Sequence, residues 1–295
     1  MSRTKITTAL KAEKILVSDG AWGTFLYQKG LQVGECPEYW NIIHPKKVKE
    51  IAQSYIDAGS DMIGTNSFGG NVFKLEHFGL ADKVAEINEV AARLSREAAG
   101  EDKWVIGSMG PTGKLVIMGE VSEEALYEAF KQQSIALEKG GADAVCIETM
   151  SDIDEAAIAI KAVRENTNLE VIATFTFDAT AENQFHTMMG VTPSEAALSA
   201  VQAGANIIGT NCGNGLRNMA IIIAQMRKVA PDTPILVHAN AGLPQLKDGK
   251  VVYLETPELV GELIPLIIQS GANIIGGCCG TTPEHIISIK KNIST

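Results

Sequence analysis

The sequence lacks several features that would mark whole classes of protein. It has no basic cluster interleaved with aromatic residues, and 35 acidic residues against 25 Lys and Arg give a formal net charge of −10. A nucleic-acid partner is therefore not expected, because phosphate backbones select basic surfaces. No long apolar run follows residues 1–6, so we expect neither a signal peptide nor a membrane-spanning segment, and no membrane partner.

Cysteine is also scarce, and its five copies in 295 residues are an odd number. Disulfide-held secreted domains are short and rich in paired cysteines. We therefore expect reduced thiols and a cytoplasmic protein. No linker or low-complexity segment divides the chain, which predicts one domain over residues 1–295.

What the sequence does contain is an internal repeat, in which a glycine precedes a short apolar run with a polar end. The copies lie at residues 58–66, 140–149, 203–212 and 270–279. Further apolar runs lie at 15–19, 104–108, 171–175 and 235–239. All eight are short and nearly continuous in apolar character, which is typical of parallel strands covered on both faces.

Helical patterns separate these predicted strands. Apolar residues at helical spacing predict helices over residues 46–58 and 123–139. Thr-Pro pairs at 192–193, 256–257 and 282–283 are typical helix starts, with threonine as the cap and proline in the first turn. The alternation predicts an α/β fold, a single (β/α)8 TIM barrel.

Polar side chains gather where the predicted strands end. In TIM barrels these ends meet on one face, which carries the chemistry. We therefore expect one site built from these residues: Asp19, Thr65, Glu148, Cys212, Asn240, Cys278 and Cys279.

Cys212, Cys278 and Cys279 are candidate metal ligands. One strand separates the two strands that carry them, so the strand ends lie roughly 10 Å apart and the thiols can converge. Three thiolates favour zinc and leave one coordination position open. Such a zinc is suited to binding a substrate thiol and lowering its pKa. Cys36 and Cys146 are interpreted as small buried apolar residues.

These residues stand in motifs that resemble the homocysteine S-methyltransferase family, most closely the homocysteine-binding barrel of the cobalamin-dependent methionine synthases. The resemblance covers nearly the whole chain. Its motifs lie at residues 19–24, 65–68, 107–113, 148–149, 211–212, 240–244 and 276–285. The last, GGCCGTTPEH, is highly specific.

The resemblance implies an enzyme that moves a methyl group to the zinc-bound thiolate of L-homocysteine and gives methionine. It implies Zn²⁺ held by Cys212, Cys278 and Cys279, with Asn240 in the fourth position when substrate is absent. For the substrate amine it implies Asp19 and Glu148. For the substrate carboxylate it implies the backbone amides at Gly20 and Ala21, together with the Thr65 region.

The methyl donor is left open by the residues. The chain stops just after the last predicted helix, so a separate methyl-corrinoid protein is the expected partner, with methylcobalamin reaching the site only on that partner. Small donors such as S-methylmethionine or betaine are alternatives, although Gly69 stands where betaine enzymes carry an aromatic residue. Residues 184–190, QFHTMMG, depart from the methionine synthase pattern. They predict either a lid of flexible apolar side chains or a related zinc enzyme that demethylates another small compound and passes the methyl group to a corrinoid protein.

An alternative of another class is a zinc-binding scaffold without catalysis, which a fourth strong ligand would favour. A redox role for Cys278 and Cys279 is disfavoured because adjacent cysteines form a strained disulfide. His238 is interpreted as a satisfied core histidine and His285 as a structural residue. Residues 110–113 are interpreted as a loop whose backbone approaches a ligand.

Overall fold

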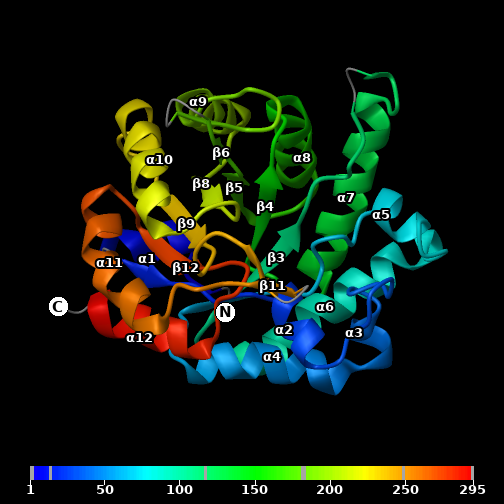
Figure 1. The fold of residues 1–295 in the computed structure, drawn as a ribbon. Coiled ribbons are helices and arrows are strands. Elements are labelled where there is room, and N and C mark those ends of the chain that lie inside the picture. Colours follow the sequence, from blue (N-terminus) through cyan, green and yellow to red (C-terminus); the bar gives the residue numbers. More distant parts are fainter. Residues whose placement is uncertain (1–2, 13–14, 116–117, 181–183, 248–249, 294–295) are drawn as a thin grey trace.

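The computed structural model describes residues 3–12, 15–115, 118–180, 184–247 and 250–293. Within these residues, eight parallel strands form one sheet that curves into a barrel (Figure 1). Their order around the barrel is β1 (Leu16–Val17), β12 (Ile274–Gly277), β9 (Ile235–Ala239), β8 (Ile207–Asn211), β5 (Glu170–Phe175), β4 (Ala144–Met150), β3 (Trp104–Met109) and β2 (Met62–Gly64). All eight coincide with strands that the sequence predicts.

The barrel is nearly closed at the junction between β1 and β2. These two strands share no ladder, but the Asp61 N–H donates to the Val17 carbonyl at 2.7 Å. The Asp61 carboxylate accepts from the Val17 N–H at 2.9 Å and from Lys290 Nζ at 2.8 Å. One acidic side chain therefore replaces the missing ladder and attaches the last helix to the junction. The predicted (β/α)8 barrel is confirmed.

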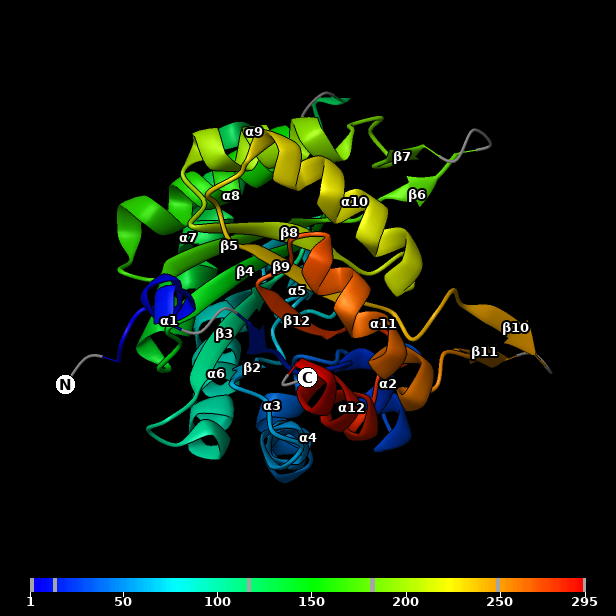
Figure 2. The same cartoon turned by 90° about the vertical axis from the view of Figure 1, so that its left-hand side faces the viewer.

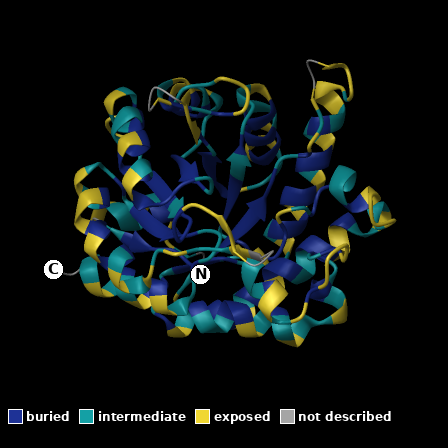
Figure 3. Ribbon diagram, viewed as in Figure 1, coloured by how far each residue is buried: buried dark blue, intermediate teal, exposed yellow. Residues whose placement is uncertain are grey.

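Helices surround the strands as a ring (Figure 1). Their bounds are α4 (Pro45–Asp57), α6 (Val84–Ala99), α7 (Glu123–Lys139), α8 (Ile153–Asn166), α9 (Pro193–Ala203), α10 (Leu216–Val229), α11 (Pro257–Gln269) and α12 (Pro283–Ile293). Shorter helices lie in the connections: α2 (Gly23–Gln28), α3 (Trp40–Ile43), α5 (Val72–Glu76) and the 3-10 helix η1 (Ala81–Lys83). Figure 3 shows the buried strands inside the ring and the exposed residues on the outer faces of the helices.

The predicted helix starts are confirmed. Thr192 and Glu195 form a reciprocal capping box at α9, and the Thr256 hydroxyl caps α11 by accepting from the Leu259 N–H. Both helices begin with proline, whose missing N–H removes no helical hydrogen bond at that position. The helix predicted over residues 123–139 has these same bounds in the structure.

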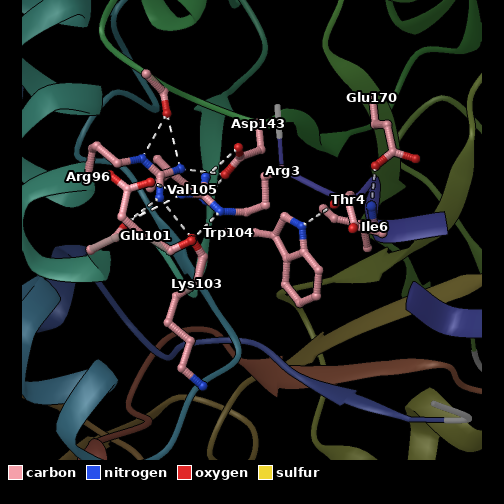
Figure 4. Close-up of polar contacts among 12 residues, drawn as sticks. Arg3, Thr4, Ile6, Arg96, Glu101, Lys103, Trp104, Val105, Asp143 and Glu170 are labelled. Atoms are coloured by element: carbon pink, nitrogen blue, oxygen red, sulfur yellow. Dashed lines mark hydrogen bonds and ion pairs between the residues drawn. The ribbon is translucent and has the colours of Figure 1, made fainter. Parts of the chain in front are cut away.

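A short helix closes the amino-terminal end of the barrel. Helix α1 (Ile6–Ala12) inserts Ile6 among the inward-facing strand residues, where that side chain is fully buried. The Glu170 carboxylate on β5 accepts a hydrogen bond from the Ile6 N–H (Figure 4). It also accepts one from the Thr7 N–H at 3.2 Å. A buried acid at the positive end of this helix satisfies two N–H groups that would otherwise lack partners.

The residues just before α1 hold it from the side. Arg3 and Arg96 both form ion pairs with Asp143, the first at 2.7 Å (Figure 4). The Trp104 indole N–H donates to the Thr4 carbonyl at 2.8 Å. Helix α1 and the residues before it therefore close the amino-terminal end of the barrel.

Two hairpins project from the opposite end of the barrel (Figure 2). One pairs β6 (Asp178–Ala179) with β7 (Phe185–His186), and the other pairs β10 (Gln245–Lys247) with β11 (Lys250–Val252). The sequence patterns predict neither hairpin. Among the described residues, no helix is long and apolar enough to cross a membrane.

Candidate active site

A cavity of about 400 Å³ lies at the carboxyl ends of the barrel strands. Eight of the residues that the sequence analysis singles out line it: Asp19, Gly20, Ala21, Thr65, Glu148, Cys212, Cys278 and Cys279. Among the described lining residues there is no lysine or arginine, whereas Asp19, Glu38 and Glu148 contribute carboxylates. The cavity therefore favours a ligand that carries positive charge.

The three cysteines converge because β9 lies between the strands that carry them. The Cys212 N–H, just after β8, donates to the His238 carbonyl at 3.0 Å, and the Cys278 N–H, just after β12, donates to the Ala239 carbonyl at 2.7 Å. Both cysteine loops are thus held to neighbouring residues of one strand. The sulfurs of Cys212, Cys278 and Cys279 all lie within 4.8 Å of one another.

The backbone at Cys212 is unusual for a residue with a side chain. Its φ angle is +59°, in the left-handed region, and Gly213 after it has a φ of +71°. This conformation ends β8 sharply and costs energy for a residue other than glycine. It accompanies the approach of the Cys212 sulfur to that of Cys279, 4.0 Å away.

The protonation of the three thiols fits a cation site. Hydrogen bonds from Cys212 and Cys278 lower the pKa of Cys279, whereas hydrogen bonds with Cys212 and Cys279 raise the pKa of Cys278. One thiolate is thus stabilised at the expense of its neighbours, because adjacent negative charges disfavour one another. Only a bound cation would allow all three to be thiolates, and three sulfur donors select a soft metal such as zinc.

Asn240 follows β9 at the same end of the barrel but does not line the cavity. Its side chain is buried, and Oδ1 has no hydrogen-bond partner among the described residues. An unpaired buried amide oxygen is unfavourable unless something binds it. The Asn240 N–H donates to the Asn214 carbonyl at 3.0 Å, which ties its loop to the loop after Cys212. The three sulfurs therefore fit zinc, and Asn240 carries an unpaired amide oxygen on a neighbouring loop.

Asp19 is buried and Glu148 is half-buried, and both carboxyl groups have raised pKa values. Burial raises the pKa of Asp19 to about 6, although the Trp22 indole N–H at 2.8 Å and the Gly64 N–H at 2.7 Å donate to its carboxylate. Burial, with a contribution from the charge of Asp19, raises the pKa of Glu148 to about 7. Ser108 and Asn211 donate to the Glu148 carboxylate. Two acids poised near neutrality would become fully charged beside a cation.

Some of the groups expected to bind a substrate carboxylate already have hydrogen-bond partners within the protein. The Ala21 N–H donates to Thr281 Oγ1 at 3.1 Å, so a ligand would share this donor. No described residue accepts from the Gly20 N–H. The Thr65 hydroxyl is 2.6 Å from Ser67 Oγ and accepts from the Ser108 N–H at 3.0 Å. Thr65 lines the cavity, and its hydroxyl is already hydrogen-bonded to Ser67 and Ser108.

The histidines have different roles. The prediction for His285 is confirmed: its ring contacts Thr282 and the Glu255 carbonyl, 2.9 Å from Nε2, at the start of α12. The interpretation of His238 as a satisfied histidine is wrong, because its buried Nε2 has no partner among the described residues and it lines the cavity. Burial lowers the pKa of His238 to about 4, so the ring is neutral. Its position in an apolar run gave no sign of this exposure to the cavity.

The other cysteines and the two loops singled out in the sequence lie outside the cluster of three thiols. Cys36 and Cys146 are buried, as expected. The Met188 side chain after β7 is 83% exposed, so in this structure the segment is not a packed lid. In the loop at 110–113, the Thr112 N–H donates to the Glu155 carboxylate at 2.7 Å, an internal contact.

One contact of the site carries no recognisable sequence signal. Asn211, at the end of β8, donates to the Glu148 carboxylate on β4 at 3.2 Å. Asn211 adjoins Cys212 in one of the motifs, but nothing in the sequence pairs it with Glu148.

Comparison with known proteins gives consistent results. The family model described as homocysteine S-methyltransferase matches residues 16–293. Methionine synthase from Mycobacterium leprae is 32% identical over 302 residues, and methionine synthase from Mycobacterium tuberculosis is 31% identical over 302 residues. The match takes in 96% of this chain in both cases but only 24% and 25% of the relatives. The chain thus spans about a quarter of their length.

Among solved structures, the metallated form of the homocysteine methyltransferase MmuM from Escherichia coli has a TM-score of 0.79 at 22% identity. The match covers 96% of this chain and 98% of that one. Its apo form gives a TM-score of 0.73 at 21% identity over 96% and 97% of the two chains. At this level of identity the likeness shows a shared barrel fold.

Proposed function

Because this chain belongs to the homocysteine S-methyltransferase family, we propose that it transfers a methyl group to the sulfur of L-homocysteine and so forms methionine. The observation that supports this most strongly is the convergence of Cys212, Cys278 and Cys279 in a cavity that also holds Asp19 and Glu148. A soft metal site beside buried carboxylates suits a substrate with a thiol and an ammonium group. Relatives named methionine synthase support the product.

Zinc is the proposed cofactor. Cys212, Cys278 and Cys279 would hold the ion, and Asn240 Oδ1 would be the fourth ligand in the absence of substrate. When bound, zinc would accept the substrate sulfur as a ligand and lower the pKa of its thiol. The chain then needs no general base beside the sulfur during methyl transfer. The need for three reduced thiols supports a cytoplasmic location.

The other end of the substrate would bind at the β1 and β4 side of the cavity. Glu148 and Asp19 would accept hydrogen bonds from the ammonium group, which compensates the cost of their burial. The Gly20 and Ala21 amides, beside Thr65, would donate to the carboxylate. Gly20 is required by the packing of this loop, because a Cβ there would lie 2.7 Å from the Tyr55 ring. These contacts orient the sulfur toward the cysteines and fix the substrate for attack.

We propose that the methyl donor is a methyl-corrinoid protein. A cavity of about 400 Å³ accommodates an amino acid but not an amino acid together with a corrinoid. The donor would therefore present its methyl group at the open end of the barrel, and methylcobalamin would reach the site only on the partner. Similarity to methionine synthases favours this donor over a small sulfonium or ammonium compound.

A second candidate function is demethylation of another small methyl compound, with transfer to a corrinoid protein. Glu38 favours it, because this third carboxylate lines the cavity and is not required by one substrate ammonium. Burial raises the pKa of Glu38, although the Gly69 N–H donates to it at 2.7 Å. Such a carboxylate suits a second positive charge on a methylated amine or sulfonium.

Zinc-edge X-ray absorption, with and without L-homocysteine, tests the main proposal. We expect three sulfurs and one oxygen or nitrogen around zinc without substrate, and four sulfurs with it. A zinc shell that ignores homocysteine would remove the assigned acceptor and favour the second candidate. Four protein ligands that no thiol displaces would instead indicate a non-catalytic zinc scaffold.

A further inference from the structure

His238 is an inward-facing residue of the barrel. Leu236, two residues earlier on β9, packs in the core cluster inside the barrel, and alternate residues of a strand point to the same side. His238 is level with Asn211 on β8 and with Gly276 on β12, the two neighbouring strands. It is half-buried and lines the cavity. Its ring therefore lies in the cavity wall, between the two strands that lead to the candidate zinc ligands.

Gly276 allows the His238 ring to lie close to the first strand of the barrel. A Cβ at Gly276 would stand 2.9 Å from His238 Cδ2 and 2.7 Å from the Asp19 carbonyl oxygen. The ring and this carbonyl thus approach the same point on β12, which lies between β9 and β1. The Asp19 carbonyl belongs to the same peptide unit as the Gly20 N–H, one of the groups proposed to bind the substrate carboxylate. His238 is therefore a neighbour of that subsite.

The other polar side chains of the cavity wall already have partners. Every hydroxyl, indole and amide side chain among the described lining residues makes a hydrogen bond within the protein: Ser18, Trp22, Thr65, Asn66, Ser67, Ser108 and Thr149. His238 differs, because its buried Nε2 has no partner in the part of the chain that the structure describes. Such an atom is unfavourable unless a ligand binds it.

We infer that His238 is a substrate-binding residue, whose Nε2–H donates a hydrogen bond to the carboxylate of the amino-acid substrate beside the Gly20 N–H. The inference rests on the proposed function, because L-homocysteine supplies that carboxylate. An imidazole can donate through Nε2, and a small tilt of this half-buried ring would bring the nitrogen to a ligand. The carboxylate would then gain a side-chain donor in a wall whose described residues include no lysine or arginine.

This role is separate from metal binding. Among the described residues, the cluster of candidate ligand atoms within 4.8 Å of one another contains the three cysteine sulfurs and no nitrogen of His238. Replacement of His238 should therefore leave the zinc content unchanged. It should also leave the melting temperature unchanged or raise it, because no hydrogen bond of Nε2 is lost within the protein.

A pair of ligands tests the inference without an activity measurement. Aminopropanethiol has the thiol and the ammonium group of homocysteine but lacks the carboxylate. In zinc-loaded His238→Phe, which keeps a ring of similar shape, we expect calorimetry to show roughly tenfold weaker binding of L-homocysteine. Binding of aminopropanethiol should be the same as in the wild type. Equal losses for the two ligands, or no loss for either, would overturn the inference.

His77→Phe is the matched control. His77 is exposed and is not among the residues that line the cavity, so both affinities should stay at their wild-type values. Nitrogen NMR of histidine-labelled wild-type protein adds a measurement that needs no variant to fold. Saturating L-homocysteine should shift a ring-nitrogen resonance that aminopropanethiol leaves in place, and the absence of such a difference would also overturn the inference.

The same titrations distinguish failure of the inference from failure of the proposed function. Zinc-loaded wild-type protein that binds no L-homocysteine would overturn the proposed function, and the inference with it. Wild-type protein that binds L-homocysteine, with His238→Phe binding it equally well, would overturn the inference alone and leave the proposed acceptor in place.

Discussion

Asn211 and Glu148 connect the metal side of the cavity to its acidic side, because Asn211 Nδ2 donates to Glu148 Oε2 at 3.2 Å and Cys212 is the next residue. Asn211 also holds Thr149, which has a φ of +60°. Its Oδ1 accepts from the Thr149 N–H at 2.8 Å, and its Nδ2 donates to the Thr149 hydroxyl at 2.7 Å. One fully buried amide thus fixes two adjacent residues of β4 and the start of the cysteine loop.

Asn211→Ala should lower both stability and substrate affinity. The change leaves groups on Thr149, Glu148 and the buried Thr174 without their partner, which costs roughly 2–4 kcal/mol of unfolding free energy. Denaturant unfolding and homocysteine titration would measure the two effects. Asn218→Ala is the control, because it removes a single half-buried contact with Asn214 at 2.8 Å. Equal losses in the two variants would contradict the role given to Asn211.

Cys212→Ala should lose zinc while the barrel remains folded. Two thiolates and an amide oxygen bind zinc far more weakly than three thiolates. Elemental analysis of purified protein would give the zinc content, and a thiol methylation assay the activity. Cys36→Ala is the matched control, since Cys36 is buried and its thiol contacts Glu38 at 3.5 Å rather than the other thiols. A zinc-free but fully active Cys212→Ala enzyme would refute the mechanism.

Homocysteine affinity should weaken as the pH falls below about 7, the pKa to which burial raises Glu148. The substrate ammonium favours the ionised carboxylate, so binding at lower pH must release a proton from Glu148. One released proton weakens affinity by about tenfold per pH unit. Calorimetric titrations from pH 5.5 to 8 would measure this slope.

Glu148→Gln isolates that contribution, because the thiol of homocysteine also titrates. The variant should bind more weakly at pH 8 and show a shallower dependence on pH than the wild type. Identical slopes in the two proteins would show that Glu148 does not exchange a proton on binding.

Glu170→Ala should release α1 from the end of the barrel without affecting zinc. The Glu170 carboxylate is buried and accepts from two backbone N–H groups of α1 and from the Thr7 hydroxyl. Its loss should cost roughly 2–3 kcal/mol of unfolding free energy. Trp104, whose indole N–H donates to the Thr4 carbonyl, should shift its fluorescence to longer wavelength.

The exposed Glu165→Ala variant is the reference for this experiment. Within the part of the chain that the structure describes, Glu165 accepts only the Tyr127 hydroxyl, so its replacement should change the unfolding free energy by about 0.5 kcal/mol or less. A zinc content that fell in Glu170→Ala but not in Glu165→Ala would show that the two ends of the barrel are coupled.

The strands and the metal ligands could be predicted from the sequence because their signals are local. Apolar runs such as 274–277 are typical of buried strands in this alternation, and small or polar residues lie at or just beyond their ends. Parallel strands place these ends on one face, so Cys212 and Cys278 could be brought together without knowledge of any side-chain contact.

The short hairpins could not be predicted. Strands β6 and β7 have two residues each, too few for a hydrophobic period to show, and β10 has all three of its residues exposed. Helix α1 was missed for a related reason: its anchor is Glu170, an acid 164 residues away from Ile6.

The sequence by itself determined the barrel, the face that carries the chemistry and the three sulfurs that meet there. Only the tertiary structure decided which polar atoms stay unpaired, as at Asn240 and His238, and which find distant partners, as Glu148 does in Asn211. The physical reason is that strand and helix patterns depend on neighbours along the chain. Desolvation and hydrogen bonding at a buried side chain depend instead on groups that are adjacent only after folding.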